Sequence, residues 1–208
     1  MAQILWPSDV TLEGDYVRLE PLSLSHISDL QEATLDGQLW KLWYTSVPSP
    51  DNMRAEIERR LGLREVGSMF PFTVISLTSG PGQGRVVGMT TYMNIDAGNR
   101  RLEIGSTWYR KSVQRTALNT EAKKMLLTHA FESLDCIAVE FRTHVLNQQS
   151  RRGIERIGAK LDGILRSHQI NQHPDAQGSL RDTCVYSITA AEWPAIRSHL
   201  THQLQGRH

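Results

Sequence analysis

The chain has 208 residues, a formal net charge of +1 and a hydrophobic content of 39%. These values are ordinary for a soluble globular protein that can bury a sizeable core, and they predict a single domain over residues 1–208. The near-zero charge excludes a general attraction to nucleic acid or to an anionic membrane surface. Any electrostatic function must therefore be local.

Cysteine usage and segment hydrophobicity bear on where the protein works. Cys136 and Cys184 are its two cysteines, and they do not form a CxxC motif. This pattern argues against a disulfide scaffold or a structural zinc site and suits a reducing compartment. The first residues lack the basic start and apolar run of a secretory signal, and no segment approaches the roughly 20 apolar residues of a membrane span. We therefore expect a cytoplasmic protein with no membrane or nucleic-acid partner.

The first part of the chain alternates between strand and helix patterns. Apolar and charged residues alternate over 17–20, which predicts a half-buried strand ended by Pro21. Apolar residues at helical spacing then predict a helix with Ser25 as its N-cap, and a second helix that opens at Asp51. The connection between these helices contains three large aromatic residues, Trp40, Trp43 and Tyr44, which is unusual for a loop.

Two further strands are predicted over 70–77 and 85–95, joined by a glycine-rich segment. The spacing of Gly80, Gly82 and Gly84 invites a nucleotide-binding interpretation. The dinucleotide fingerprint must open a helix, however, and this segment opens a strand. A hairpin turn is therefore the favoured interpretation.

The remaining pattern completes a mixed sheet. The predicted elements are a strand over 100–109, a helix up to 131, a strand over 137–145, a helix over 148–157 closed by Gly158, strands over 159–170 and 180–188, and a last helix containing Trp193. Three consecutive strands imply antiparallel pairing, and the later strand–helix–strand unit implies one parallel crossover. The fold class is thus α/β (α+β), with a mostly antiparallel central sheet and helices on both faces.

The entrance to the central helix is crowded with hydrogen-bonding side chains. Gln114, Arg115 and Thr116 precede the helix, and Asn119 and Thr120 lie in its first turn. About four backbone N–H groups lack partners at a helix start, where the dipole is positive, so this turn could cradle a phosphate. Four basic residues add positive charge nearby: Arg110, Lys111, Lys123 and Lys124. The alternative is that these residues are ordinary caps and a solvated basic face.

The order of these segments resembles the GNAT acetyltransferase superfamily, and specifically its RimJ/RimL-type branch. The similar segments are "LEGDYVRLEPLSLSHISDL", "RRLEIGSTW", "LNQQSRRGIERIGAKLDGILR" and "RDTCVYSITAAEWP", which together span roughly residues 12–194. The family's "Q/R-x-x-G-x-G/A" loop corresponds to the segment that starts at Gln114. Ala117 and Asn119 occupy its two small positions. Alanine in a helical first turn costs little, so we expect binding to survive with looser contacts.

The resemblance implies acetyl-CoA as cosubstrate and direct transfer of its acetyl group to an amine. Its pyrophosphate would lie on the loop and first turn formed by Gln114, Arg115, Thr116, Ala117, Leu118, Asn119 and Thr120. Backbone amides near Thr107, Trp108 and Tyr109 would polarise the thioester carbonyl. Asn147 would hold the pantetheine arm or cap its helix, and Arg151 would reach the phosphates or remain solvated.

The catalytic residues implied by the resemblance are Glu103 and Ser150. Glu103 would accept the proton of the amine, or else be an ordinary strand charge paired with Arg101 or Arg142. The family's tyrosine acid is replaced by Ile154. Ser150, one turn earlier, would then donate to the departing thiolate, unless it merely caps its helix.

The acceptor side is less well defined by the sequence. Trp40, Trp43 and Tyr44, together with Trp108, would form the wall of the acceptor site, or else pack as ordinary core. The acceptor would be a protein N-terminus or a small amine. A non-catalytic CoA-binding module is the alternative function. No HxH or HExxH spacing occurs among the histidines, so no metal is expected, and a homodimer is one expected state because this family often dimerises.

Overall fold

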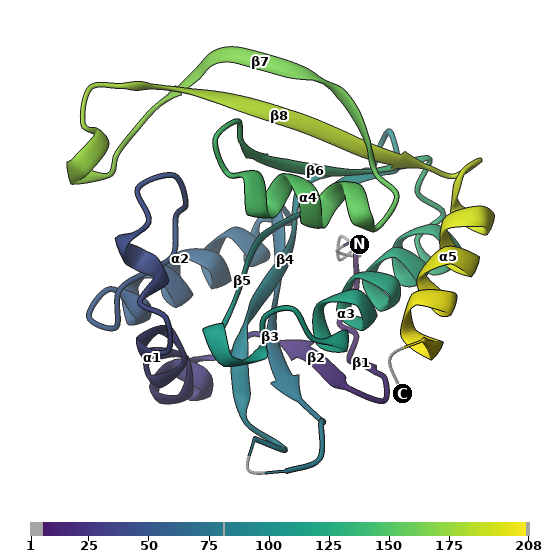
Figure 1. Cartoon of the computed structure of the whole chain (residues 1–208), viewed down its shortest axis with the longest axis horizontal. Coiled ribbons are helices and arrows are strands. Elements are labelled where there is room, and N and C mark those ends of the chain that lie inside the picture. Colours follow the sequence, from purple (N-terminus) through teal and green to yellow (C-terminus); the bar gives the residue numbers. More distant parts are fainter. Residues whose placement is uncertain (1–5, 81, 207–208) are drawn as a thin grey trace.

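The computed structural model describes residues 6–80 and 82–206. Within these residues the strands form an eight-stranded sheet in the order β1-β2-β3-β4-β5-β6-β8-β7 (Figure 1). Every neighbouring pair is antiparallel except β5 and β6, which are parallel. The predicted mixed, mostly antiparallel sheet is confirmed. The strands are β1 Leu12–Glu13, β2 Val17–Pro21, β3 Met69–Ser76, β4 Val86–Asp96, β5 Arg101–Tyr109, β6 Ala138–His144, β7 Lys160–Ile170 and β8 Leu180–Thr189.

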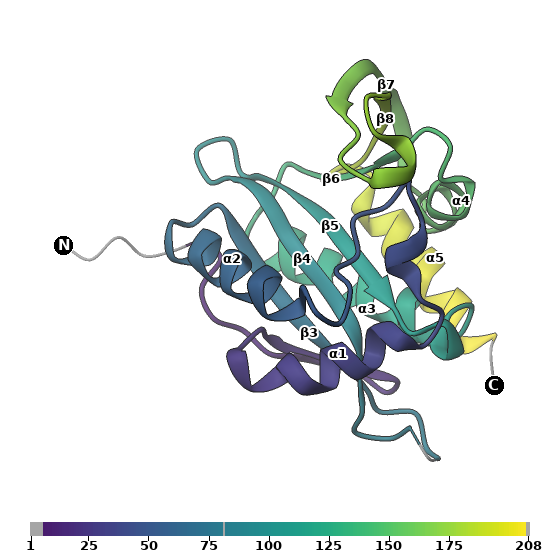
Figure 2. The same ribbon diagram turned by 90° about the vertical axis from the view of Figure 1, so that its left-hand side faces the viewer.

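Helices cover both faces of this sheet. They are α1 Ile27–Leu35, α2 Met53–Glu65, α3 Ala117–Thr128, α4 Gln148–Arg156 and α5 Trp193–Gln205. Figure 2 shows α1 and α2 in front of the strands, with α3 and α5 behind them. Two apolar clusters result: Leu30, Ile57 and Met89 belong to the cluster under α1 and α2, whereas Leu126 and Leu200 belong to the cluster under α3 and α5. We call these the α1–α2 face and the α3 face of the sheet.

Several predicted boundaries shift by a few residues. The predicted N-cap Ser25 is wrong: Ser25 lies inside a 3-10 turn, Leu24–His26, which precedes α1 and is capped by Ser23. His26 explains the shift, because its Nδ1 accepts a hydrogen bond from the Ser23 amide at 3.2 Å. Gly158 ends α4 with φ 96°, as its predicted C′ role requires. The glycine-rich segment after β3 connects two antiparallel strands, which confirms the hairpin interpretation.

Strands β5 and β6 separate partway along their length. Their parallel register covers only Arg101–Glu103 against Ala138–Glu140. A bulge in β5 follows, where the pairing with β4 shifts and Ser106 adopts φ 47°. Beyond it β6 pairs with β8 up to His144, while β5 leads into α3. We call the stretch where the strands part, residues 104–109 of β5 and 141–144 of β6, the β5–β6 divergence.

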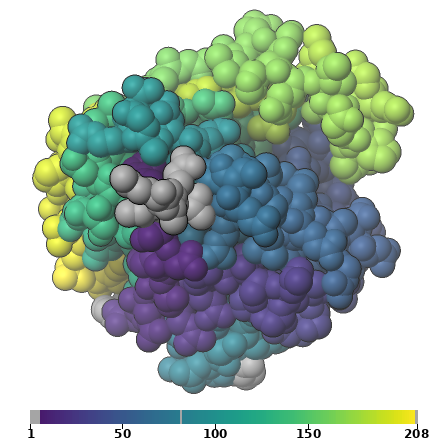
Figure 3. Space-filling view, turned by 180° about the vertical axis from the view of Figure 1, so that it is seen from behind, coloured from purple at the N-terminus to yellow at the C-terminus, as the bar shows by residue number. Residues whose placement is uncertain are grey.

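The β7–β8 hairpin extends beyond the body of the molecule. Figure 3 shows its green and yellow residues as a ridge at the top of the molecule seen from behind. Strand β7 is exposed along nearly its whole length, and β8 pairs with it on one edge and with β6 on the other. No described helix is long and apolar enough to cross a membrane.

Candidate active site

The start of α3 lies directly after the β5–β6 divergence. Thr116 is its N-cap: the hydroxyl accepts a hydrogen bond from the Leu118 amide at 3.3 Å and donates to Val113 O at 2.8 Å. Among the amides from 115 to 120, the described residues give a side-chain partner only to Leu118. The capping role of Thr116 is therefore real, and it leaves other N–H groups of the turn available to an anion.

Backbone geometry explains why the loop tolerates residues other than glycine. The left-handed conformation of this loop falls on Arg115, with φ 65°. Ala117 and Asn119 both lie within α3, where side chains of any ordinary kind are accommodated. The Gln114 side chain braces the turn, because its Nε2 donates to Tyr109 O at 3.1 Å.

Two of the four basic residues expected to add positive charge near the start of α3, Arg110 and Lys123, point into the protein instead. Arg110 is buried, donates from Nε to Val86 O at 3.0 Å and pairs with Glu32. Lys123 is only 7% exposed and reaches the sheet instead of the loop. The prediction that these two add positive charge at the loop is therefore wrong. The helical spacing of Lys123 could have indicated its burial, because it lies on the same face of α3 as the buried residues Thr120 and Leu127.

Glu103 lies on the α1–α2 face at the beginning of the divergence and is 4% exposed. Asn94 Nδ2 donates to its Oε2 at 2.7 Å, and Arg142 Nε lies 3.5 Å from the same oxygen. Burial raises the pKa of the Glu103 carboxyl, while the Asn94 hydrogen bond and the Arg142 charge oppose this rise. Arg101 pairs with Glu140 instead. Glu103 thus combines a raised pKa with an ion pair to Arg142, one of the two partners predicted from the sequence.

Space beside Glu103 is kept open by a glycine. A Cβ built at Gly105 would lie 2.6 Å from Glu103 Oε1, so a larger residue there would push the carboxylate aside. A surface hollow of about 500 Å³ is lined by Asn94 and Arg142, the two polar partners of Glu103, although Glu103 itself does not line it. Its lining residues are Asn94, Asp96, Asn99, Arg101, Leu102, Ile137, Glu140 and Arg142.

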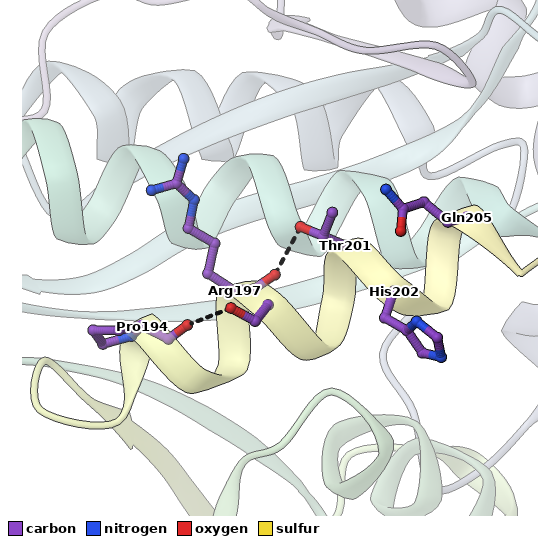
Figure 4. A pocket seen from close by; sticks show the side chains of 6 residues that line it. Pro194, Arg197, Thr201, His202 and Gln205 are labelled. Atoms are coloured by element: carbon purple, nitrogen blue, oxygen red, sulfur yellow. Dashed lines mark hydrogen bonds between the residues drawn. The ribbon is translucent and has the colours of Figure 1, made fainter.

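A second hollow, of about 400 Å³, lies along α5 (Figure 4). It is lined by Pro194, Arg197, Ser198, Thr201, His202 and Gln205, all from that one helix. The hydroxyls of Ser198 and Thr201 donate to carbonyls one turn earlier, so they are engaged within the helix. No residue of the β5–β6 divergence contributes to this hollow, and we do not assign it to the active site.

Helix α4 begins shortly after β6, and its first turn contacts the loop before α3, because Gln149 Nε2 donates to Gln114 Oε1 at 3.2 Å. Asn147 is its N-cap, and its Oδ1 accepts the Ser150 amide at 3.0 Å. This cap uses Oδ1 and not the Nδ2 donors. Ser150 is therefore not the cap, and it lies half-buried in the first turn. Arg151 donates from Nε to Tyr186 Oη at 3.0 Å, which turns its guanidinium toward β8. Ile154, which stands where the resemblance places the family's tyrosine, packs against the core of the α3 face.

Aromatic residues of the α1–α2 connection contact a histidine at the end of β6. Trp43 makes edge-to-face contacts with Tyr44 and with His144, at centroid distances of 5.7 and 5.1 Å. These two aromatics and Trp40 are half-buried, whereas Trp108 belongs to the core of the α1–α2 face. His144 was not singled out from the sequence. His144 is the last residue of β6 and is 3% exposed. Its Nδ1 accepts a hydrogen bond from the Leu146 amide. Its pKa is lowered, mainly by burial.

The described part of the chain holds no group of three or more His, Cys, Asp or Glu side chains arranged to bind a metal ion.

The candidate site consists of a buried carboxylate, a helix start with unpaired backbone amides, an asparagine that caps α4 and a set of aromatic residues. They come together around the β5–β6 divergence from segments that are distant in sequence.

The chain matches the model of the acetyltransferase (GNAT) domain over residues 17–160. It is 34% identical over 110 residues to YdaF of Bacillus subtilis, named as a ribosomal N-acetyltransferase; this match covers 53% of the chain and 57% of YdaF. A GCN5-related N-acetyltransferase structure from Brucella melitensis is 31% identical, covers 95% of the chain and 86% of its own length, and has a TM-score of 0.79. The fold is also that of RimL, a ribosomal protein acetyltransferase solved with coenzyme A, at 19% identity and a TM-score of 0.71, covering 86% of the chain and 98% of RimL.

The family match spans more than half of the chain, and its described fold agrees with solved acetyltransferase structures over nearly the whole length. The chain therefore belongs to the GNAT acetyltransferase family.

Proposed function

We propose that the protein is an N-acetyltransferase that transfers acetyl directly from acetyl-CoA to a primary amine. The observation that carries this proposal is the placement of the α3 start immediately after the β5–β6 divergence. A row of N–H groups at a helix start is an anion site, and the neighbouring strand separation leaves backbone amides of β5 without a β6 partner. The two features together suit a molecule with a diphosphate at one end and a thioester at the other.

The residues at the divergence fit coenzyme A. The amides of the 115–120 turn would hold the diphosphate, with Thr116 fixing the turn through its cap. Asn147 would hold the pantetheine arm through Nδ2, because Oδ1 already serves as the cap of α4. When bound, acetyl-CoA would supply the activated acyl group, and the protein would supply orientation and proton transfer.

The alternating direction of the backbone amides in β5 indicates which amide could donate to the thioester carbonyl. Arg110 N donates to Val87 O, so this amide points toward β4. Successive amides of an extended strand point to opposite sides, which directs the Tyr109 amide toward the divergence. The Tyr109 carbonyl is reached by Gln114 from outside the sheet, in agreement with this orientation. We assign the Tyr109 N–H as a donor to the carbonyl oxygen, where negative charge develops.

Glu103 would accept the proton of the attacking amine, directly or through a water molecule. Its carboxylate is desolvated, which raises its pKa and makes it a better base than an exposed glutamate. We propose that the acceptor approaches Glu103 from the side of the hollow that its partners Asn94 and Arg142 line. Trp43 and Tyr44 would bound the acceptor on the side of the α1–α2 connection.

The acceptor is proposed to be a protein N-terminus or a small primary amine, and the working compartment the cytoplasm. YdaF and RimL carry names that refer to ribosomal proteins, so N-terminal peptides of ribosomal proteins are the first acceptors to test. A homodimer remains part of the proposal, to be tested by analytical ultracentrifugation. A CoA-binding module without catalysis is the competing function, favoured by Ile154 in place of the tyrosine acid.

The decisive experiment combines binding with turnover. Calorimetry with coenzyme A tests the site, and release of free thiol from acetyl-CoA over a panel of peptides and small amines tests transfer. Glu103→Gln is the catalytic variant and Glu13→Gln a matched control at an exposed carboxylate. Coenzyme A binding with thiol release that needs Glu103 supports the proposal. Binding without any acetylated acceptor would favour the module, and no binding at all would refute both.

A further inference from the structure

Lys123 is a buried amine at the base of the divergence. Its Nζ donates to Thr107 Oγ1 at 2.8 Å and to Thr90 Oγ1 at 3.3 Å, and these two hydroxyls lie 2.8 Å apart. In the described part of the chain no carboxylate forms an ion pair with Lys123. A buried ammonium without a counter-ion is costly, so this lysine is held in a setting that favours release of its proton.

The charged and titratable groups around Lys123 do not compensate for its charge. On β4 and β5, Tyr92 and Tyr109 belong to the same buried cluster, and burial raises the pKa of each phenol, which keeps both neutral. On α3 itself, Glu121 accepts three amides of the β1–β2 turn. Arg156 of α4 donates to Thr120. The hydroxyls of Thr90 and Thr107 are thus the polar groups that contact the amine.

Thr107 connects this amine to the site. It follows the bulge at Ser106, at the point where β5 has left β6, and its side chain is half-buried where that of Lys123 is buried. The hydroxyl lies 3.4 Å from Gly105 O, a long and weak contact, and 2.8 Å from Thr90 Oγ1, which can be the donor of that pair; with Thr90 as donor, the Thr107 proton can turn toward a ligand at low cost. Thr107 could therefore contact a bound molecule directly, whereas Lys123 would act only through its hydrogen bond to Thr107.

We propose that Lys123 and Thr107 form the proton relay that protonates the leaving sulfur of coenzyme A. This inference rests on the proposed function and supplies the acid that Ile154 cannot provide. Thr107 would be the catalytic residue, because it touches the sulfur, and Lys123 would be a positioning and proton-supplying residue that acts through it.

The proton balance of the step is simple. The amine nitrogen gives one proton to Glu103 and forms a bond to the acetyl carbon, and the carbon–sulfur bond breaks with its electron pair going to sulfur. Thr107 gives its hydroxyl proton to the sulfur and takes one from the Lys123 ammonium, which becomes a neutral amine. Lys123 regains a proton from solvent once coenzyme A has left. Burial lowers the pKa of Lys123 to about 7, which suits a group that gives and takes a proton near neutrality.

The test uses binding and does not depend on the identity of the acceptor. Calorimetry measures the affinities for coenzyme A and for desulfo-coenzyme A between about pH 6.5 and about pH 8.5, a range that spans the titration of Lys123 and lies below that of free thiols. In the wild type the relay stabilises the bound thiolate only while Lys123 is protonated, so affinity for coenzyme A relative to the desulfo analogue should rise roughly threefold up to about pH 7.5 and then level off as Lys123 loses its proton. Lys123→Met and Thr107→Val should each abolish the rise. Lys124→Met, one residue further along α3 and only half-buried, should keep it.

Each result decides the inference. A rise lost in both relay variants supports it. A rise unchanged in Lys123→Met overturns the relay, and one kept in Thr107→Val overturns the role of the hydroxyl. Affinity ratios that are flat with pH in the wild type also refute the relay while leaving coenzyme A binding intact. Absence of any binding to the wild type would instead refute the proposed function. Urea unfolding of every variant shows that each is folded, and a purely structural lysine would change both affinities equally.

Discussion

Replacing Lys123 by methionine should remove a pH dependence from the stability of the fold. Burial lowers the pKa of this amine from 10.5 to about 7. Between these values the lysine of the unfolded chain carries a proton that the folded protein has released. The unfolded state then binds more protons, and the free energy of unfolding rises with pH. Below about pH 7 both states are protonated, and the full cost of the buried charge is present.

The size of the effect follows from the two pKa values. Linkage puts the cost of Lys123 at about 4 kcal/mol at pH 7 and about 2 kcal/mol at pH 9, so the wild type gains about 2 kcal/mol over this interval. Methionine has no such term, and it leaves the hydrogen bond between Thr90 and Thr107 in place. Lys123→Met should therefore be more stable than the wild type at pH 7, with an advantage about 2 kcal/mol smaller at pH 9.

Urea unfolding of the wild type, Lys123→Met and Lys124→Met at the two pH values measures this difference. All other titrating groups contribute equally to the three proteins and cancel in the comparison. Parallel changes in the wild type and Lys123→Met would refute the reasoning, because they would mean that Lys123 stays protonated in the fold. The Lys124→Met control should follow the wild type.

Local patterns were sufficient to predict most of the fold. The strand predicted over 70–77 is β3 Met69–Ser76, and the strand predicted over 180–188 is β8 Leu180–Thr189. These elements depend on periodicity and turn chemistry, which a few neighbouring residues encode. The error at Ser25 has the same origin. A competing local interaction, the contact between His26 and the Ser23 amide, placed the cap two residues earlier.

The charge state of a site depends on distant segments and was harder to predict. Glu103 could be placed on a strand, but its partners come from the neighbouring strands β4 and β6. Arg142 is one of the two ion-pair partners considered for Glu103, but nothing near position 103 in the sequence indicates that Asn94 also contacts it. The prediction that Lys123 is a loop cation overlooked its place on a buried face of the helix. Its burial follows from the packing of α3 against β4 and β5, which brings two threonine hydroxyls to its amine.

Three further predictions concern separate parts of the molecule. Glu121→Ala should lower stability by about 3 kcal/mol and the melting temperature by roughly 10 °C, because three amides of residues 15–17 lose their carboxylate; an unchanged melting curve would contradict this. Asn147→Ala should weaken coenzyme A binding in calorimetry, and an unaltered affinity would remove it from the pantetheine site. Glu103→Gln should lose turnover most above the raised pKa of Glu103, where the wild-type carboxylate is ionised and can act as the base. Burial raises the pKa of Glu103, so the wild-type base is itself lost as pH falls through that raised value, and the variant should lack this acid limb. If both proteins keep the same acid limb in thiol-release assays, the proton acceptor is a different group.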